Sequence, residues 1–148
     1  LEFRRVLFRS KKESIKNLKK IKLYPHVKRI INILKKKYKL AIVTSKDMER
    51  TLMLLKRFNI NFDCVICPTK NIRGKPFPDQ LIKALKYYGE KNHNSVYVGD
   101  MLVDYKAARA AGVEFIYAKY GYGKQYKFYK NYLDRFSDIE NILIKKFS

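Results

Sequence analysis

Two aspartates four residues apart, Asp100 and Asp104, flank a short loop in the stretch Val96–Gly112, VYVGDMLVDYKAARAAG. The β-branched and aromatic run before the loop predicts a strand, and the alanines after it predict a helix. Ligands of open α/β sheets bind beyond the carboxyl ends of strands, where Asp100 would lie. Asp100 could bind a hard cation directly, and Asp104 could bind it or orient a bound water. The structural alternative makes Asp100 a turn residue and Asp104 a helix N-cap.

Two further loops carry groups that suit a phosphate. Thr44 and Ser45 follow the apolar run KLAIV and can donate hydroxyl and backbone hydrogen bonds to phosphoryl oxygens. Lys75 lies in RGKPFPD, a loop stiffened by two prolines, and Asp79 could cap the helix that follows. With the acidic pair, these loops predict a site where a hydroxyl, a cation and a metal surround a transferring phosphoryl group. Alternatively, Thr44 and Ser45 only cap a helix, and Lys75 is an ordinary lysine.

The elements that must position these residues alternate along the chain. Apolar and β-branched runs predict strands at 39–44, 63–67, 95–98 and 114–118. Helical periodicity predicts helices from Pro25 to Lys37, at 47–58, at 79–88, from Asp104 to Gly112, and at 139–144. In the second helix we expect an inner face formed by Met48, Leu52, Leu55 and Phe58. This alternation predicts an α/β fold with a parallel sheet covered on both faces.

Length and composition predict a single core, since the chain has 148 residues and 47% of them are hydrophobic. No apolar run approaches the ~20 residues of a membrane helix, and the first residues show no secretory signal pattern. Cys64 and Cys67 lack a second ligand pair for zinc and would point to opposite faces of a strand. We therefore expect two buried thiols in a reducing cytoplasm.

The formal net charge is +21, from 34 lysines and arginines against 13 acidic residues. Such a balance suggests nucleic acid as a partner, but the lysines are spread along the whole chain. Aromatic residues do not alternate with them in a base-stacking module. The composition therefore does not favour nucleic-acid binding as the main function, although the positive field would attract anionic substrates. The oligomeric state is left open.

The first ten residues, LEFRRVLFRS, differ in composition from the rest. They contain three of the nine arginines in a chain that otherwise prefers lysine, and VLFRS matches one translated frame of a common sequencing adapter. We interpret residues 1–10 as translated adapter joined to a gene fragment, and exclude them from fold reasoning. The alternative is a genuine basic N-terminal extension.

The segments VTSK, GKPFPD and GDMLVDYKAARAAG, in this order and spacing, resemble the second, third and fourth motifs of the haloacid dehalogenase-like hydrolases. Over about Leu23 to Gly123 the chain is most similar to the phosphoglycolate phosphatase-like branch. The resemblance implies a Rossmann-like three-layer parallel sheet. It also implies a cytoplasmic, Mg²⁺-dependent phosphatase that cleaves small phosphorylated metabolites through an aspartyl-phosphate. A phosphomutase is a close variant of this activity.

By position, the resemblance assigns Thr44 as the phosphate-binding hydroxyl, with Ser45 in place of the asparagine often found beside it. Lys75 becomes the lysine that steadies the nucleophile and the developing charge. Asp100 becomes the magnesium ligand, with Asp104 supporting it.

One part of the family pattern is missing. Family members carry an attacking aspartate at the end of the central strand and a second aspartate two residues later, but here the earliest aspartate is Asp47. We therefore expect that the first motif, its strand and most of the helical cap lie outside the chain. Residues 11–22 would be the remnant of the cap and 23–148 the core. The absent strand would leave a gap between the strands ending at Thr44 and Asp100, and the fragment would be inactive and poorly stable. The alternative is a non-catalytic relative that keeps the fold for binding or regulation.

Overall fold

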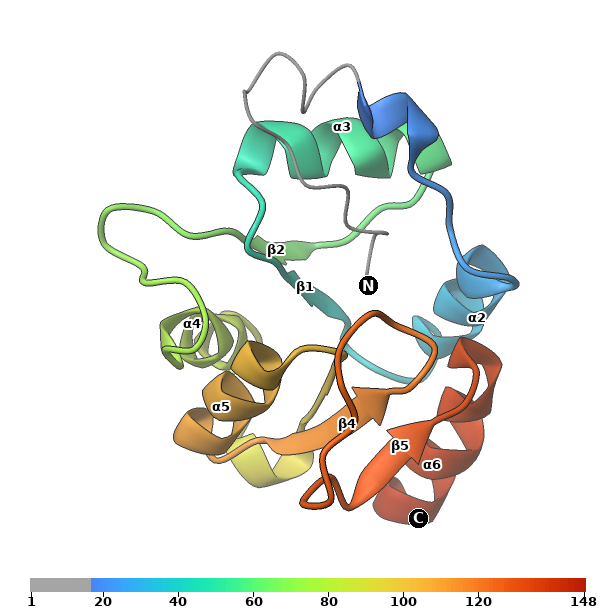
Figure 1. The fold of residues 1–148 in the computed structure, drawn as a ribbon, viewed down its shortest axis with the longest axis vertical. Coiled ribbons are helices and arrows are strands. Elements are labelled where there is room, and N and C mark those ends of the chain that lie inside the picture. The colour runs from blue at the N-terminus through green and yellow to red at the C-terminus, as the bar shows by residue number, and fades with distance from the viewer. Residues whose placement is uncertain (1–16) are drawn as a thin grey trace.

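The structure is a computed structural model that describes residues 17–148, in which short parallel strands alternate with helices (Figure 1). The expected adapter at 1–10 and the first half of the expected cap remnant, residues 11–16, lie outside these residues. The elements, in chain order, are η1 (Leu18–Lys20), α2 (Val27–Leu34), β1 (Ala41–Val43), α3 (Met48–Phe58), β2 (Cys64–Ile66), α4 (Asp79–Tyr88), η2 (Asn92–Asn94), β3 (Val96–Gly99), α5 (Leu102–Ala111), β4 (Glu114–Ala118), β5 (Asn131–Leu133), η3 (Phe136–Asp138) and α6 (Ile139–Phe147).

The strands form two parallel sheets, one of β1 and β2 and one in the order β3-β4-β5. Helices α4 and α5 pack on one face, while α2, α3 and α6 cover the other (Figure 1). The chain thus has the three layers of an α/β protein, which confirms the predicted fold class. None of the helices described between residues 17 and 148 has the length and apolarity needed to cross a membrane.

Among residues 17–148 no strand lies between β1 and β3, so the two sheets are separate at the place where the sequence predicts a gap. The Thr44 N–H donates to Ile66 O at 3.1 Å, so the main-chain groups of Thr44 point towards β2. Because the direction alternates along a parallel strand, the N–H and C=O of Val43 point away from β2. A cavity of about 410 Å³ is lined from both sheets and from the helices above and below, by Leu40, Val43, Leu81, Val96, Val98 and Leu143 among others. The described core is therefore open at its centre.

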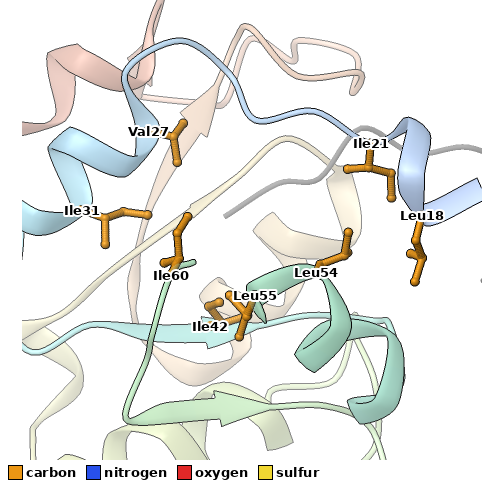
Figure 2. Packing of buried hydrophobic residues seen from close by; sticks show 8 residues of the cluster. All are labelled: Leu18, Ile21, Val27, Ile31, Ile42, Leu54, Leu55 and Ile60. Carbon is orange, nitrogen blue, oxygen red and sulfur yellow. The ribbon is translucent and has the colours of Figure 1, made fainter. Parts of the chain in front are cut away.

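The largest buried cluster joins the first helices to β1 (Figure 2). Apolar side chains from η1, α2, α3 and the segment before β2 converge on Ile42, and the cluster comprises Leu18, Ile21, Val27, Ile31, Ile42, Leu54, Leu55 and Ile60. Burying aliphatic side chains of this size is worth about 1.5–3 kcal/mol each. This cluster therefore anchors β1 and α3 on the side of the sheet opposite α4.

The predicted inner face of the helix at 47–58 was wrong at two positions. Met48 is 42% exposed and Leu52 is 51% exposed, while Thr51 and Leu54 are fully buried. The helix begins one residue after its N-cap, Asp47, whose Oδ1 accepts from Arg50 N at 2.9 Å. The buried stripe therefore follows Thr51, Leu54 and Leu55, because two leucine-rich faces were available and tertiary packing selected one of them.

Other elements also differ from the sequence prediction, and α5 begins at Leu102, two residues before the predicted start at Asp104. The strand β5, Asn131–Leu133, was not predicted, because its three residues carry no alternating apolar pattern before they pair with β4. Strand β1 is shorter than the expected 39–44 run. Cys64 and Cys67 are buried free thiols, as expected.

Candidate functional site

Thr44 directly follows β1, at the carboxyl edge of its sheet. Its hydroxyl oxygen accepts from Lys46 N at 3.1 Å, which orders the tight turn that also presents the exposed Ser45. The alternative in which Thr44 and Ser45 cap the next helix does not hold, because Asp47 caps α3. The hydroxyls and backbone N–H groups of this loop thus lie where strand-end loops of α/β proteins meet ligands.

Lys75 forms a buried ion pair with Asp104. Its Nζ lies 2.5 Å from Asp104 Oδ1, and the two side chains are only 11% and 3% exposed. The same ammonium donates to the hydroxyl of Tyr97 at 3.1 Å. Lys75 comes from the loop before α4 and Asp104 from the first turn of α5, so the pair joins segments on either side of the break in the sheet.

Asp104 is fully engaged by donors from the protein. Its Oδ1 contacts Lys75 and the Tyr97 hydroxyl, and its Oδ2 accepts from Met101 N at 2.9 Å at the start of α5. Asp104 is therefore not the N-cap of α5, which is Met101, but as the third residue of the helix it accepts from the N-cap backbone and holds a cation at the same time. A Cβ on Gly99 would come within 2.6 Å of the Asp104 Cβ, so glycine at the end of β3 allows this close approach.

Asp100 leaves the end of β3 and is 6% exposed. Its Oδ2 accepts from Tyr122 N at 2.6 Å, which fixes the carboxylate against the loop after β4. Added Cβ atoms at Gly121 and Gly123 would overlap Asp100 itself. The two glycines therefore let the loop lie directly on the acidic residue that the sequence singled out.

Gln80, which is buried in the first turn of α4, joins the ends of β1 and β2. Its Nε2 donates to Thr44 O at 2.8 Å and to Ile66 O at 3.1 Å, the carbonyls at the ends of β1 and β2. Its Oε1 has no partner among the described residues. Nothing in the local sequence pattern marks this residue, which the sequence analysis missed.

The predicted cap at Asp79 was wrong. Asp79 is the first residue of α4 rather than its N-cap, and its carboxylate binds Arg73 at Nη2 (2.8 Å) and Nε (2.9 Å). The hydrogen-bonded Arg73 guanidinium holds the pKa of the Asp79 carboxyl below its ordinary value. This pair closes the proline-containing loop that carries Lys75.

The donor set for a divalent cation is partial. Asp100 supplies a nearly buried carboxylate, the hard oxygen ligand that Mg²⁺ prefers, and so it fits one position in a magnesium site. Asp104 fits better as a support, because both of its oxygens already accept from the protein. Within residues 17–148 no group of three or more His, Cys, Asp or Glu residues is arranged to hold a metal. Further ligands would have to come from elsewhere.

The structure brings Lys75 and Asp104 together and joins them through Tyr97 to the residue before Thr44, whereas the printed contact of Asp100 is with the loop after β4. The Val43 carbonyl, adjacent to Thr44, lies 3.4 Å from the Tyr97 hydroxyl, which contacts Lys75 and Asp104, and Asp100 follows the strand that carries Tyr97. Tyr97 was not predicted as a site residue. The available signal was a hydroxyl in the middle of an apolar strand, since a buried tyrosine usually needs a hydrogen-bond partner.

Comparison with known proteins gives a consistent result. A family model described as haloacid dehalogenase-like hydrolase matches residues 2–118. The match extends into residues 1–10, whose origin as adapter sequence stays a prediction.

Two curated relatives and one solved structure show how much of the chain is shared. A phosphoglycolate phosphatase of Nitrosococcus oceani is 34% identical over 107 residues, which are 70% of this chain and 48% of that protein. A putative pyrophosphatase PpaX of Caldanaerobacter subterraneus is 33% identical over 102 residues, 68% of this chain and 46% of that protein. The crystal structure of a predicted phosphoglycolate phosphatase from Haemophilus somnus superposes with a TM-score of 0.76 at 28% identity, over 86% of this chain and 60% of that one. The chain thus spans about half the length of the curated relatives it matches.

Proposed function

The chain belongs to the haloacid dehalogenase-like hydrolases, and on that premise we propose that it forms part of a phosphatase of small phosphorylated metabolites, similar to phosphoglycolate phosphatase. The observation that carries the proposal is the buried Lys75–Asp104 pair, which Tyr97 links to the Val43 carbonyl at the end of β1, next to Thr44. A cation held rigidly at such a place, next to backbone and hydroxyl donors, suits a phosphoryl group.

Each residue has a distinct role in this proposal. Thr44 would donate its hydroxyl hydrogen to a phosphoryl oxygen, because its oxygen already accepts from Lys46 N. Lys75 has an ammonium N–H beyond its two contacts, and would direct it at the charge that builds on the phosphoryl group. Asp100 would hold Mg²⁺, which when bound offsets the negative charge of the phosphate. Asp104 would keep the lysine in place.

The attacking group would come from outside these residues. The first aspartate of the chain, Asp47, is occupied as the N-cap of α3 and pairs with Arg50 at 2.7 Å. Asp47 follows Thr44, and the only acidic side chains before Thr44 in the sequence are Glu2 and Glu13. We therefore expect that the 148 residues alone bind phosphate but do not turn over a phosphomonoester, because no aspartyl-phosphate can form.

The test compares the chain with the longer protein encoded by the complete gene. With Mg²⁺, the longer protein should hydrolyse 2-phosphoglycolate and lose most of that activity as Lys75→Met. The 148 residues should bind inorganic phosphate, seen as broadening of its ³¹P resonance, but should not hydrolyse p-nitrophenyl phosphate. Hydrolysis by the 148 residues would refute the prediction that they lack the nucleophile. A longer protein without phosphatase activity would refute the proposed function and favour a binding or regulatory role.

A further inference from the structure

Tyr97 meets groups from three other segments through a single hydroxyl. The oxygen lies 3.1 Å from Lys75 Nζ, 3.3 Å from Asp104 Oδ1 and 3.4 Å from the carbonyl oxygen of Val43. These partners come from the loop before α4, from α5 and from β1, while Tyr97 itself lies in the middle of β3. Two of them, Val43 and Lys75, lie on the opposite side of the break in the sheet from β3.

The protons that each group carries determine which group donates and which accepts in these hydrogen bonds. An ammonium group has only donors, so the Tyr97 oxygen accepts from Lys75. The single phenolic proton can then go to the Val43 carbonyl or to the Asp104 carboxylate. Either way the hydroxyl is polarised by a charged or main-chain group, which strengthens its hold on the ammonium.

Two acceptors constrain the lysine more than one does. An ion pair with Asp104 alone sets a distance but leaves the ammonium able to pivot around the carboxylate. A second acceptor on β3 fixes the direction of the Nζ as well, so that its third N–H points in one direction.

We propose that Tyr97 is a positioning residue that aims the Lys75 ammonium at the bound phosphoryl group. The inference rests on the proposed function and adds to it a residue outside the three recognised motifs. A role as a core aromatic packed beside Phe115 at 6.4 Å needs only the ring, which phenylalanine would supply equally well, so the hydroxyl contacts distinguish the two roles.

Tyr97→Phe is the direct test, and Tyr88→Phe is its matched control. The Tyr88 hydroxyl also donates to a carbonyl beside β1, that of Leu40 at 2.7 Å, but it does so at the end of the strand remote from Thr44. Both variants keep the ring and lose one hydroxyl, so a general effect of losing a tyrosine hydroxyl should appear in both.

Two readouts apply to the 148-residue chain. The first is the ¹⁵N-detected ammonium resonance of Lys75, identified by its loss in Lys75→Met, which we expect to be sharp in the wild type and in Tyr88→Phe but broadened in Tyr97→Phe. The second is the affinity for inorganic phosphate, which we expect Tyr97→Phe to weaken roughly five- to tenfold, the effect of one polar contact, and Tyr88→Phe to leave unchanged.

The outcomes separate the two proposals. If the wild type binds phosphate and both readouts are the same in the two variants, the positioning role is refuted and the proposed phosphate site stands. If the wild type binds no phosphate, the phosphate site is refuted, and the Lys75 resonance still decides whether Tyr97 holds the ammonium. A resonance that is equally sharp in Tyr97→Phe would overturn the inference in either case.

Discussion

The Lys75→Met variant tests whether the buried ion pair stabilises the fold as well as the site. Removing one member of a buried pair leaves the other charge uncompensated, which typically costs about 3–5 kcal/mol. Lys75 and Asp104 are 11% and 3% exposed, so this range applies to them. Asp104 keeps its contacts to Met101 N and the Tyr97 hydroxyl in the variant. We therefore expect the free energy of unfolding to fall by about 3 kcal/mol, the lower end of this range.

The matched control is Lys39→Met, which removes a lysine of the same length from a surface pair. Lys39 lies 2.8 Å from Glu90, but the two side chains are 56% and 34% exposed. Exposed pairs of this kind contribute about 0–1 kcal/mol. Urea unfolding followed by circular dichroism measures both variants. With an m value of about 2 kcal/mol/M, Lys75→Met should lower the midpoint by about 1.5 M and Lys39→Met by less than about 0.5 M.

A double-mutant cycle separates the interaction between Lys75 and Asp104 from other effects of the Lys75→Met substitution. Asp104→Asn alone should also destabilise, whereas adding it to Lys75→Met should cost little more, because the uncompensated charge is then gone. A coupling energy of about 2 kcal/mol is expected for groups in direct contact. Equal midpoints for Lys75→Met and Lys39→Met, or additive losses in the double variant, would refute the buried-pair reasoning.

Three further predictions concern the rest of the molecule. Gly123→Ala places a Cβ where the backbone after β3 already lies and should lower the melting temperature by about 5 °C or more, whereas Gly74→Ala, with only an ordinary 3.6 Å contact, should not. Burial raises the thiol pKa of Cys64 and Cys67, so both should react slowly with Ellman's reagent until urea unfolds the chain; fast native reaction would contradict their burial. Desolvation raises the pKa of Tyr129 from 10.0 to about 12, so the unfolded chain loses this proton first and the free energy of unfolding should fall as the pH rises from 10 towards 12; urea melts at pH 9 and pH 11 should show a smaller fall in Tyr129→Phe.

Most of the fold could be predicted because its elements are locally encoded. The continuous apolar runs before Thr44 and Asp100 and the helical periodicity between them specify parallel strands and crossover helices without reference to tertiary contacts. The face of α3 could not be predicted, because Met48 and Leu52 are as apolar as the residues that are buried instead. Strand β5 could not be predicted either, since pairing with β4 rather than its own sequence makes it a strand.

Part of the candidate site could likewise be predicted from the sequence, and part of it could not. Residues at strand ends, Thr44 and Asp100, could be placed from topology alone, because the carboxyl ends of parallel strands meet at one edge. The contacts of Tyr97 and Gln80 depend on side chains that reach across elements, as when Gln80 donates to the carbonyls that end β1 and β2. Such long-range polar contacts leave no periodic pattern in the sequence, so they could not be predicted from it.

The break between β1 and β3 also has a consequence for motion. Thr44 and Asp100 lie on opposite sides of this break. Among the described residues, the two sides are joined near the site by side-chain contacts, Lys75 to Asp104 and Tyr97 to Val43, and not by a ladder of backbone hydrogen bonds. Side-chain contacts can open more easily than a continuous sheet, so the distance between the ends of β1 and β3 should fluctuate. A strand that paired with both β1 and β3 would fix the distance between them, and would thereby set the distance between the groups that bind a phosphate.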